Sequence, residues 1–282
     1  MSKYLGDHHN VLVGSVKDSQ YFSTDLKNRV ITKLEDYMGL FSEADETLHQ
    51  AIGEASATYL FSQEAIKNIL QFNPNAKLIV MLRNPVDLLP SLHSQLIVAG
   101  QENILDFEAA WRAEGERSEG KQISKFCKDP NVLAYSQWGK LGEQVERLYS
   151  TGPAENIKVI LFDDFIRDTG AIYEEVLDFL GVPKDGKTSF PVLNEKKHTK
   201  NPFMQRALAF TATAWGVLQA ISPVKFKLGV YTLLFKLNTS KAKKPVLSNE
   251  LRNELIEFYR DDIGVLSKRI DKDLSEWVSK SK

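Results

Sequence analysis

The sequence predicts an α/β protein in which helices flank a parallel sheet on both sides, in three layers. Two short runs, LIVML at 78–82 and IKVILF at 157–162, indicate buried parallel strands because they are almost continuously apolar rather than alternating. A helix-like segment follows each run, and an amphipathic helix is expected over 172–180. Strands that alternate with helices in this way are typical of a parallel α/β sheet.

The elements of the first half of the chain follow in order. Val11–Val13 gives the first strand signal, and the polar stretch from 25 to 46 is expected to be helical. Residues 51–59, AIGEASATY, predict a loop, and helical signal resumes over 64–70. The strand at 78–82 comes next, and its apolar composition predicts that both of its faces are covered.

The second half contains helices on either side of the 157–162 strand. An amphipathic stretch at 107–111 precedes a charged segment, 112–125, that is expected to be exposed. Residues 136–149 predict a helix with apolar residues on one side. The helix over 172–180 is expected to end at Gly181, since glycine adopts the left-handed C-cap conformation without strain.

Composition excludes several classes of protein. The chain has 282 residues, is 43% apolar and carries a net charge of −1, which fits one globular domain over 1–282 and argues against nucleic acid as the main partner. Its single cysteine, Cys127, cannot form an intramolecular disulfide, and this favours a reducing compartment. The N-terminal residues contain neither a signal peptide nor a membrane span. We therefore expect a cytoplasmic protein, and no histidine spacing indicates a metal site.

The segment 203–247 is expected to form a helical lid or packing subregion. Its part from 203 to 237 is unusually apolar, but Pro223 and two lysines divide it into pieces too short to span a bilayer. Contact with a membrane surface is the alternative to a helical pair packed on the core. The C-terminal helix is expected to begin with Ser248 as its N-cap.

An anion site is predicted where the 78–82 strand ends. Arg83 follows the strand, at the edge where open α/β sheets bind their ligands, and Asn84-Pro85 breaks the chain before a helix that carries Ser91. A guanidinium and a hydroxyl near a helix start can both bind phosphate. The alternative is an ordinary strand–turn–helix in which Arg83 pairs with a surface carboxylate.

Three other segments could carry chemistry. Glu54, in GEASATY, is either a general base for a substrate hydroxyl or an acid that caps a helix. The loop at 14–23 contains Lys17, but its spacing does not match a phosphate-binding P-loop. The basic run NEKKHTKN at 194–201 can contact phosphates or form a solvated loop.

Arg83, Asn84-Pro85 and Ser91 together resemble the 3′-phosphate-binding motif of the sulfotransferase family. These enzymes use 3′-phosphoadenosine 5′-phosphosulfate (PAPS) as the sulfuryl donor, and the resemblance implies that Arg83 and Ser91 bind its 3′-phosphate. GEASATYL resembles the segment that carries the catalytic glutamate in the carbohydrate (heparan-type) branch, which implies that Glu54 deprotonates the acceptor. The resemblance also implies that Lys17 neutralises the transferring sulfuryl group.

The family resemblance has further implications. Lys197 and Lys200 correspond to a basic loop that closes the nucleotide pocket. The implied fold is a P-loop-NTPase-like sheet, and the chain resembles family members from the helix after the 5′-phosphosulfate loop onward, so the first strand and that loop are expected to be missing. Loss of such an anion cradle lowers the expected activity.

The resemblance therefore implies a PAPS-dependent sulfotransferase without a metal, acting on a hydroxyl or amine of a carbohydrate or small molecule. The alternative is a catalytically degenerate homologue that binds a nucleotide or a partner. A P-loop phosphotransferase shares the architecture, but its phosphate-binding loop is not visible in the sequence. If an N-terminal anchor has been lost, the Golgi lumen replaces the cytoplasm as the expected location.

Overall fold

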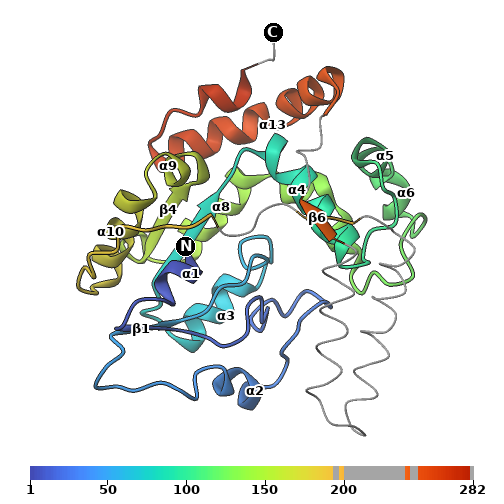
Figure 1. Cartoon of the computed structure of the whole chain (residues 1–282). Helices are drawn as coiled ribbons and strands as arrows, with labels where there is room; N and C mark the ends of the chain where they lie inside the picture. Colours follow the sequence, from blue (N-terminus) through green and yellow to red (C-terminus); the bar gives the residue numbers. More distant parts are fainter. Residues whose placement is uncertain (193–196, 200–238, 242–246, 280–282) are drawn as a thin grey trace, which may run out of the picture. The chain divides into compact units, whose positions relative to one another are not determined.

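Figure 1 shows a computed structural model, which describes residues 1–192, 197–199, 239–241 and 247–279. The chain divides into two compact units. The first unit comprises Met1–Asn84, Lys140–Pro191 and Tyr259–Ser279, and the second comprises Pro85–Gly139, Val192–Phe258 and Lys280–Lys282. The organisation as one domain over 1–282 stays a prediction.

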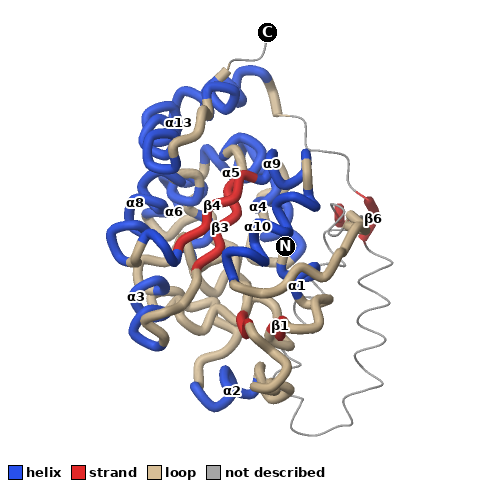
Figure 2. The backbone as a smooth tube through the Cα atoms, turned by 90° about the vertical axis from the view of Figure 1, so that its left-hand side faces the viewer, coloured by secondary structure: helices blue, strands red, loops and turns tan. Residues whose placement is uncertain are grey.

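Two pairs of parallel strands form the sheets of the first unit. Strand β1 (Val11–Val13) pairs with β2 (Ala51–Gly53), and β3 (Leu78–Leu82) pairs with β4 (Ile157–Leu161). Figure 2 shows β3 and β4 side by side. The prediction of parallel strands is confirmed, and β3 has the predicted bounds. Because both pairs are parallel, the residues that follow two paired strands emerge at the same edge of their sheet.

Helices cover both faces of the β3–β4 sheet. Helix α10 (Thr169–Leu180) packs on the face that carries Ile79 and Ile160. The opposite face, with Val80 and Val159, packs against α3 (Ala65–Phe72) and α8 (Leu141–Thr151). Around this sheet the structure thus has the predicted arrangement of parallel strands flanked by helices.

The remaining elements of the first unit are short. They are α1 (Ser2–Leu5), α2 (Leu34–Gly39), α9 (Phe162–Arg167) and the 3-10 turns η2 (Ala154–Asn156) and η3 (Ser275–Val278). Helix α10 ends at Gly181, whose φ of 76° is left-handed, so the predicted C-cap is confirmed.

The described part of the second unit is mainly helical. Its elements are α4 (Pro85–Val98), α5 (Phe107–Arg112), α6 (Glu114–Ser118), η1 (Pro130–Leu133), α7 (Tyr135–Trp138), and the antiparallel pair β5 (Lys197–Thr199) and β6 (Thr239–Lys241). The rings of His93, Phe107 and Tyr135 contact one another in its interior. Helix α13 (Asn249–Ile270) begins in this unit and continues into the first unit from Tyr259 onward. The N-cap at Ser248 is confirmed, since its Oγ accepts a hydrogen bond from Leu251 N at 3.1 Å.

Several expectations about single segments were wrong. Strand β3 is not covered on both faces throughout: Met81 is 37% exposed because the cluster built by α10 reaches Ile79 but not Met81. Residues 51–59 are not all loop, since Ala51–Gly53 form β2. Within 112–125, Arg117 is buried because it pairs with Glu102.

The predicted helix over 25–46 is also wrong for most of its length. Only α2 forms there. The residues before α2 bind to another loop instead of forming a helix. The backbone N–H groups of Val30 and Ile31 both donate hydrogen bonds to the carbonyl of Ser19. These hydrogen bonds replace the i to i−4 bonds that a helix would need at those residues.

Most of the predicted lid over 203–247 lies outside the described residues, as does the whole of the apolar stretch at 203–237. In the part of the chain that is described, no helix combines the length and the apolar character needed to cross a membrane.

Candidate active site

The Glu54 carboxylate is surrounded by hydroxyl groups at the carboxyl end of β2. Ser19 Oγ and Ser56 Oγ donate hydrogen bonds to Glu54 Oε2, at 2.8 and 3.1 Å. The Tyr59 hydroxyl donates to the other oxygen, Oε1. Glu54 is half-buried, and no lysine, arginine or histidine of the described chain lies within ion-pair distance of it. We refer to Glu54, Ser19, Ser56 and Tyr59 as the Glu54 cluster.

Two loops build this cluster, one after β1 and one after β2. The strand ends are joined by a hydrogen bond from Gly14 N to Gly53 O at 2.8 Å. Further along, Asp18 N donates to Ala55 O at 3.0 Å, and Asp18 Oδ1 accepts from Ala57 N at 3.0 Å. These contacts hold the two loops side by side, so that Ser19 of one loop reaches the carboxylate carried by the other.

Aromatic rings surround the cluster. Tyr21 stacks on Tyr37 with ring centroids 4.4 Å apart, and Phe22 contacts both Tyr37 and Tyr59 edge to face. Burial, followed by the nearby carboxylate of Glu54, raises the pKa of both Tyr37 and Tyr59 well above the ordinary phenol value. Both phenols therefore stay protonated at neutral pH, and Tyr59 remains a hydrogen-bond donor to Glu54.

Lys17 lies in the same loop as Ser19 but points to solvent. Its side chain is 67% exposed, and its ammonium is 3.8 Å from a carboxylate oxygen of the adjacent Asp18. Among the described residues the structure thus brings Ser19, and not Lys17, into contact with Glu54.

Arg83 is the residue directly after β3 in the first unit. It is half-buried, and its guanidinium lies over the ring of Phe162 at 5.2 Å from the centroid. No carboxylate in the described ranges forms an ion pair with it, so the alternative in which Arg83 pairs with a surface carboxylate does not hold there. An arginine without a carboxylate partner can bind a phosphate without first breaking a salt bridge.

Ser91 belongs to the second unit and lies on α4, which begins at Pro85 as the sequence predicted. It is half-buried, and its hydroxyl makes no hydrogen bond to any other described residue. Lys197 lies in β5 opposite Lys241, rather than in the expected loop. Lys200 lies outside the described residues.

Sequence reasoning missed the hydroxyl partners of Glu54. Ser19, Ser56 and Tyr59 have no periodic or spacing pattern, because the contact depends on two loops that are far apart in the sequence. The one available signal was the abundance of hydroxyl residues directly after Glu54, in the segment 54–59.

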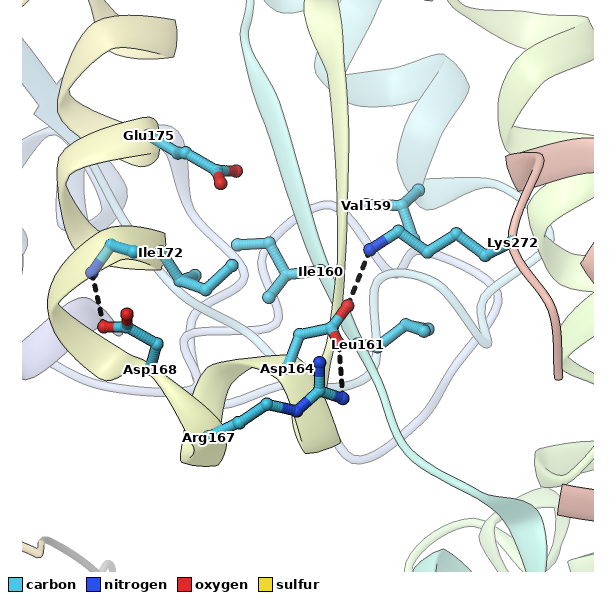
Figure 3. A pocket seen from close by; sticks show the side chains of 10 residues that line it. Val159, Ile160, Leu161, Asp164, Arg167, Asp168, Ile172, Glu175 and Lys272 are labelled. Carbon is cyan, nitrogen blue, oxygen red and sulfur yellow. Dashed lines mark hydrogen bonds and ion pairs between the residues drawn. The ribbon is translucent and has the colours of Figure 1, made fainter. Parts of the chain in front are cut away.

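A cavity of about 240 Å³ lies elsewhere in the first unit, against β4 and α10 (Figure 3). Lys272 and Arg167 both point toward Asp164: Lys272 Nζ is 2.6 Å from Asp164 Oδ2, and Arg167 Nη2 is 3.0 Å from Asp164 Oδ1. None of the predicted site residues lines the cavity. Its cations are thus already neutralised by a carboxylate. In the described chain, no group of three or more side chains is arranged to hold a metal ion.

The first unit thus has parallel strands covered by helices, with the Glu54 carboxylate directly after β2 and Arg83 directly after β3. The sulfotransferase domain family matches residues 20–208, which is more than half of the sequence. The chain therefore belongs to the sulfotransferase domain family. The predicted enzyme class is confirmed, and membership of this family implies PAPS as the sulfuryl donor.

Two solved structures are similar to the chain. A sulfotransferase from Alicyclobacillus acidocaldarius has a TM-score of 0.69 and 24% sequence identity, with 98% of this chain and 92% of the other covered. This similarity confirms the coarser part of the fold prediction, a mixed α/β fold with parallel strands flanked by helices. A sulfotransferase domain from the curacin biosynthetic pathway has a TM-score of 0.36 and 17% identity over 54% of this chain and 45% of the other. A search of curated proteins finds no match.

Proposed function

We propose that the protein transfers a sulfuryl group from PAPS to a hydroxyl or amine of a carbohydrate or small-molecule acceptor, with Glu54 as the general base. The observation that carries this proposal is the Glu54 carboxylate itself. It lies at the carboxyl end of a parallel strand, is half-buried, and is held by hydroxyl groups rather than by a cation. A carboxylate without a cationic partner retains its ability to accept a proton.

Binding of the donor is assigned to Arg83 and Ser91. The observations that support this role are an arginine without a carboxylate partner and a serine hydroxyl without a hydrogen bond, both judged within the described residues. Both groups are suited to a phosphate, because the guanidinium supplies charge-assisted hydrogen bonds and the hydroxyl supplies one more donor. Lys17 is the candidate for contact with the sulfuryl oxygens, and Lys197 and Lys200 are candidates for the nucleotide phosphates.

PAPS supplies the sulfur atom and a good leaving group. Glu54 takes the proton of the acceptor hydroxyl while the acceptor oxygen forms a bond to sulfur. The bond between sulfur and the 5′-phosphate oxygen breaks, and 3′,5′-ADP leaves with the electron pair. As in phosphoryl transfer, the protein contributes mainly position and charge stabilisation.

Sulfotransfer from ³⁵S-labelled PAPS to a panel of glycans, simple alcohols and amines tests the proposal. We expect Glu54→Gln to lower the rate by about 10²–10⁴-fold, the usual contribution of a general base, while 3′,5′-ADP binding measured by calorimetry stays unchanged. Arg83→Ala should weaken 3′,5′-ADP binding by about 10–100-fold, the usual value of a hydrogen-bonded charge.

Arg167→Ala is the matched control, since Arg167 is an exposed arginine paired with Asp164. It should leave 3′,5′-ADP affinity as it is. Tight nucleotide binding without transfer to any acceptor would instead establish the catalytically degenerate homologue. Full activity of Glu54→Gln would remove Glu54 as the base.

A further inference from the structure

We propose that Ser19, Ser56 and Tyr59 are positioning residues that fix the Glu54 carboxylate, so that Oε1 is the atom that receives the acceptor proton. This inference rests on the proposed function and assigns three residues that the family resemblance did not. It follows from the number of hydrogen bonds that each oxygen of the carboxylate accepts.

The two oxygens of Glu54 differ in the number of hydrogen bonds they accept. A carboxylate has about four lone-pair sites, two on each oxygen. Oε2 accepts from both Ser19 Oγ and Ser56 Oγ, so its sites are filled. Oε1 accepts from Tyr59 alone among the described residues. The remaining site for a substrate proton is therefore on Oε1.

Each of the donors is itself held in place. Ser19 is fully buried, its carbonyl accepts from Val30 and Ile31, and its Oγ lies 3.3 Å from the Tyr59 hydroxyl. Ser56 Oγ accepts from Gln20 N at 3.0 Å. The carboxylate and its donors thus form a connected network, which fixes the orientation of the base before a substrate arrives.

The charged and titratable groups around Glu54 support the same role. The Tyr59 hydroxyl bonds to Glu54, Tyr37 lies close enough for the Glu54 charge to raise its pKa, and Tyr21 stacks on Tyr37. Lys17 and Asp18, in the same loop as Ser19, pair with each other. Among the described residues, the negative charge of Glu54 is therefore stabilised by neutral donors rather than by a cation.

Sulfotransfer kinetics on the full chain test the inference. In Tyr59→Phe and in Ser56→Ala we expect kcat to fall about 10-fold, because each substitution removes one hydrogen-bond donor to the Glu54 carboxylate. The KM for PAPS should not change, since neither side chain is assigned to donor binding.

Matched controls separate this role from a general loss of stability. Tyr37→Phe removes the hydroxyl of a buried tyrosine near the cluster, and among the described residues this hydroxyl makes no hydrogen bond to Glu54. Ser23→Ala removes a fully buried hydroxyl that bonds to Thr58 and not to Glu54. Neither substitution should change kcat. Ser19→Ala is a third test variant. If Ser19→Ala does not fold, Ser56→Ala still tests the inference, because Ser56 is only half-buried.

The outcomes distinguish the two proposals. If Glu54→Gln abolishes transfer but Tyr59→Phe and Ser56→Ala behave as the controls do, the positioning network is wrong and Glu54 remains the base. If Glu54→Gln retains transfer, the base assignment fails first, and the inference fails with it. A lower kcat at an unchanged KM for PAPS in Tyr59→Phe and Ser56→Ala, with unchanged controls, supports the inference.

Discussion

Glu102 and Arg117 form a buried ion pair in the second unit. Their side chains are 0% and 4% exposed, and Arg117 Nη2 donates to both carboxylate oxygens at 2.9 and 2.8 Å. Glu102 also accepts from the Tyr135 hydroxyl and from the backbone N–H groups of Asn103 and Ile104. One carboxylate therefore accepts hydrogen bonds from a guanidinium, a phenol and two backbone N–H groups.

We expect Glu102→Gln to lower the free energy of unfolding by about 3–5 kcal/mol, because it leaves a buried guanidinium without a counter-charge. Urea unfolding measures the change. The control is Glu254→Gln, which breaks an exposed pair with Arg112 and should cost under about 1 kcal/mol. An equal loss of unfolding free energy in the two variants would show that the buried pair stabilises the fold no more than the exposed pair does.

At the scale of elements, α8 and α13 approach each other closely in the first unit. Asp262 of α13 caps α8, since its carboxylate accepts from Gly142 N at 2.7 Å and from Glu143 N at 2.9 Å. A Cβ on Gly142 would lie 2.2 Å from the backbone oxygen of Asp262. Glycine is thus required at this position by the neighbouring backbone and not by its own conformation.

Gly142→Ala should therefore destabilise the protein by about 1–3 kcal/mol, the usual cost of overpacking. Gly264→Ala, within α13, is the opposite case, because nothing lies within 4 Å of the added Cβ. It should stabilise the protein by about 0.5–1 kcal/mol through helix propensity. Thermal unfolding of the two variants compares them directly, and a shift of the same sign in both would contradict this account of the contact.

At the scale of the whole molecule, ligand binding and stability are linked. A ligand that binds only the folded chain stabilises it by an amount set by its concentration relative to its dissociation constant, about 2.7 kcal/mol at a hundredfold excess. If the donor site is as proposed, 3′,5′-ADP should raise the unfolding temperature of the chain. The same concentration should have little effect on Arg83→Ala. An equal rise in both proteins would place the nucleotide elsewhere.

The sequence predicted those parts of the structure that local patterns determine. Strand β3 has its predicted bounds, Gly181 ends α10 and Ser248 caps α13, because apolar runs and capping residues act over a few positions. Strand β2 was missed because it has three residues and exists by pairing with β1.

The candidate site was predicted only in part, for the same reason. Glu54 was identified, but its contact with Ser19 joins residues 35 positions apart, and no local pattern encodes such a contact. The burial of Arg117 was missed because the charged segment around it is mostly exposed, and its partner lies outside that segment.

The two parallel strand pairs differ in how much chain must exist before they can form. The connection from Val13 to Ala51 is half as long as the one from Leu82 to Ile157, and a doubling of loop length adds about 0.6 kcal/mol to the entropy cost of closure. All residues of β1, β2 and the Glu54 cluster are present once synthesis has passed Tyr59. The β3–β4 sheet must wait for Leu161. During biosynthesis every residue of the Glu54 cluster therefore exists before the strand that leads to Arg83 has its partner.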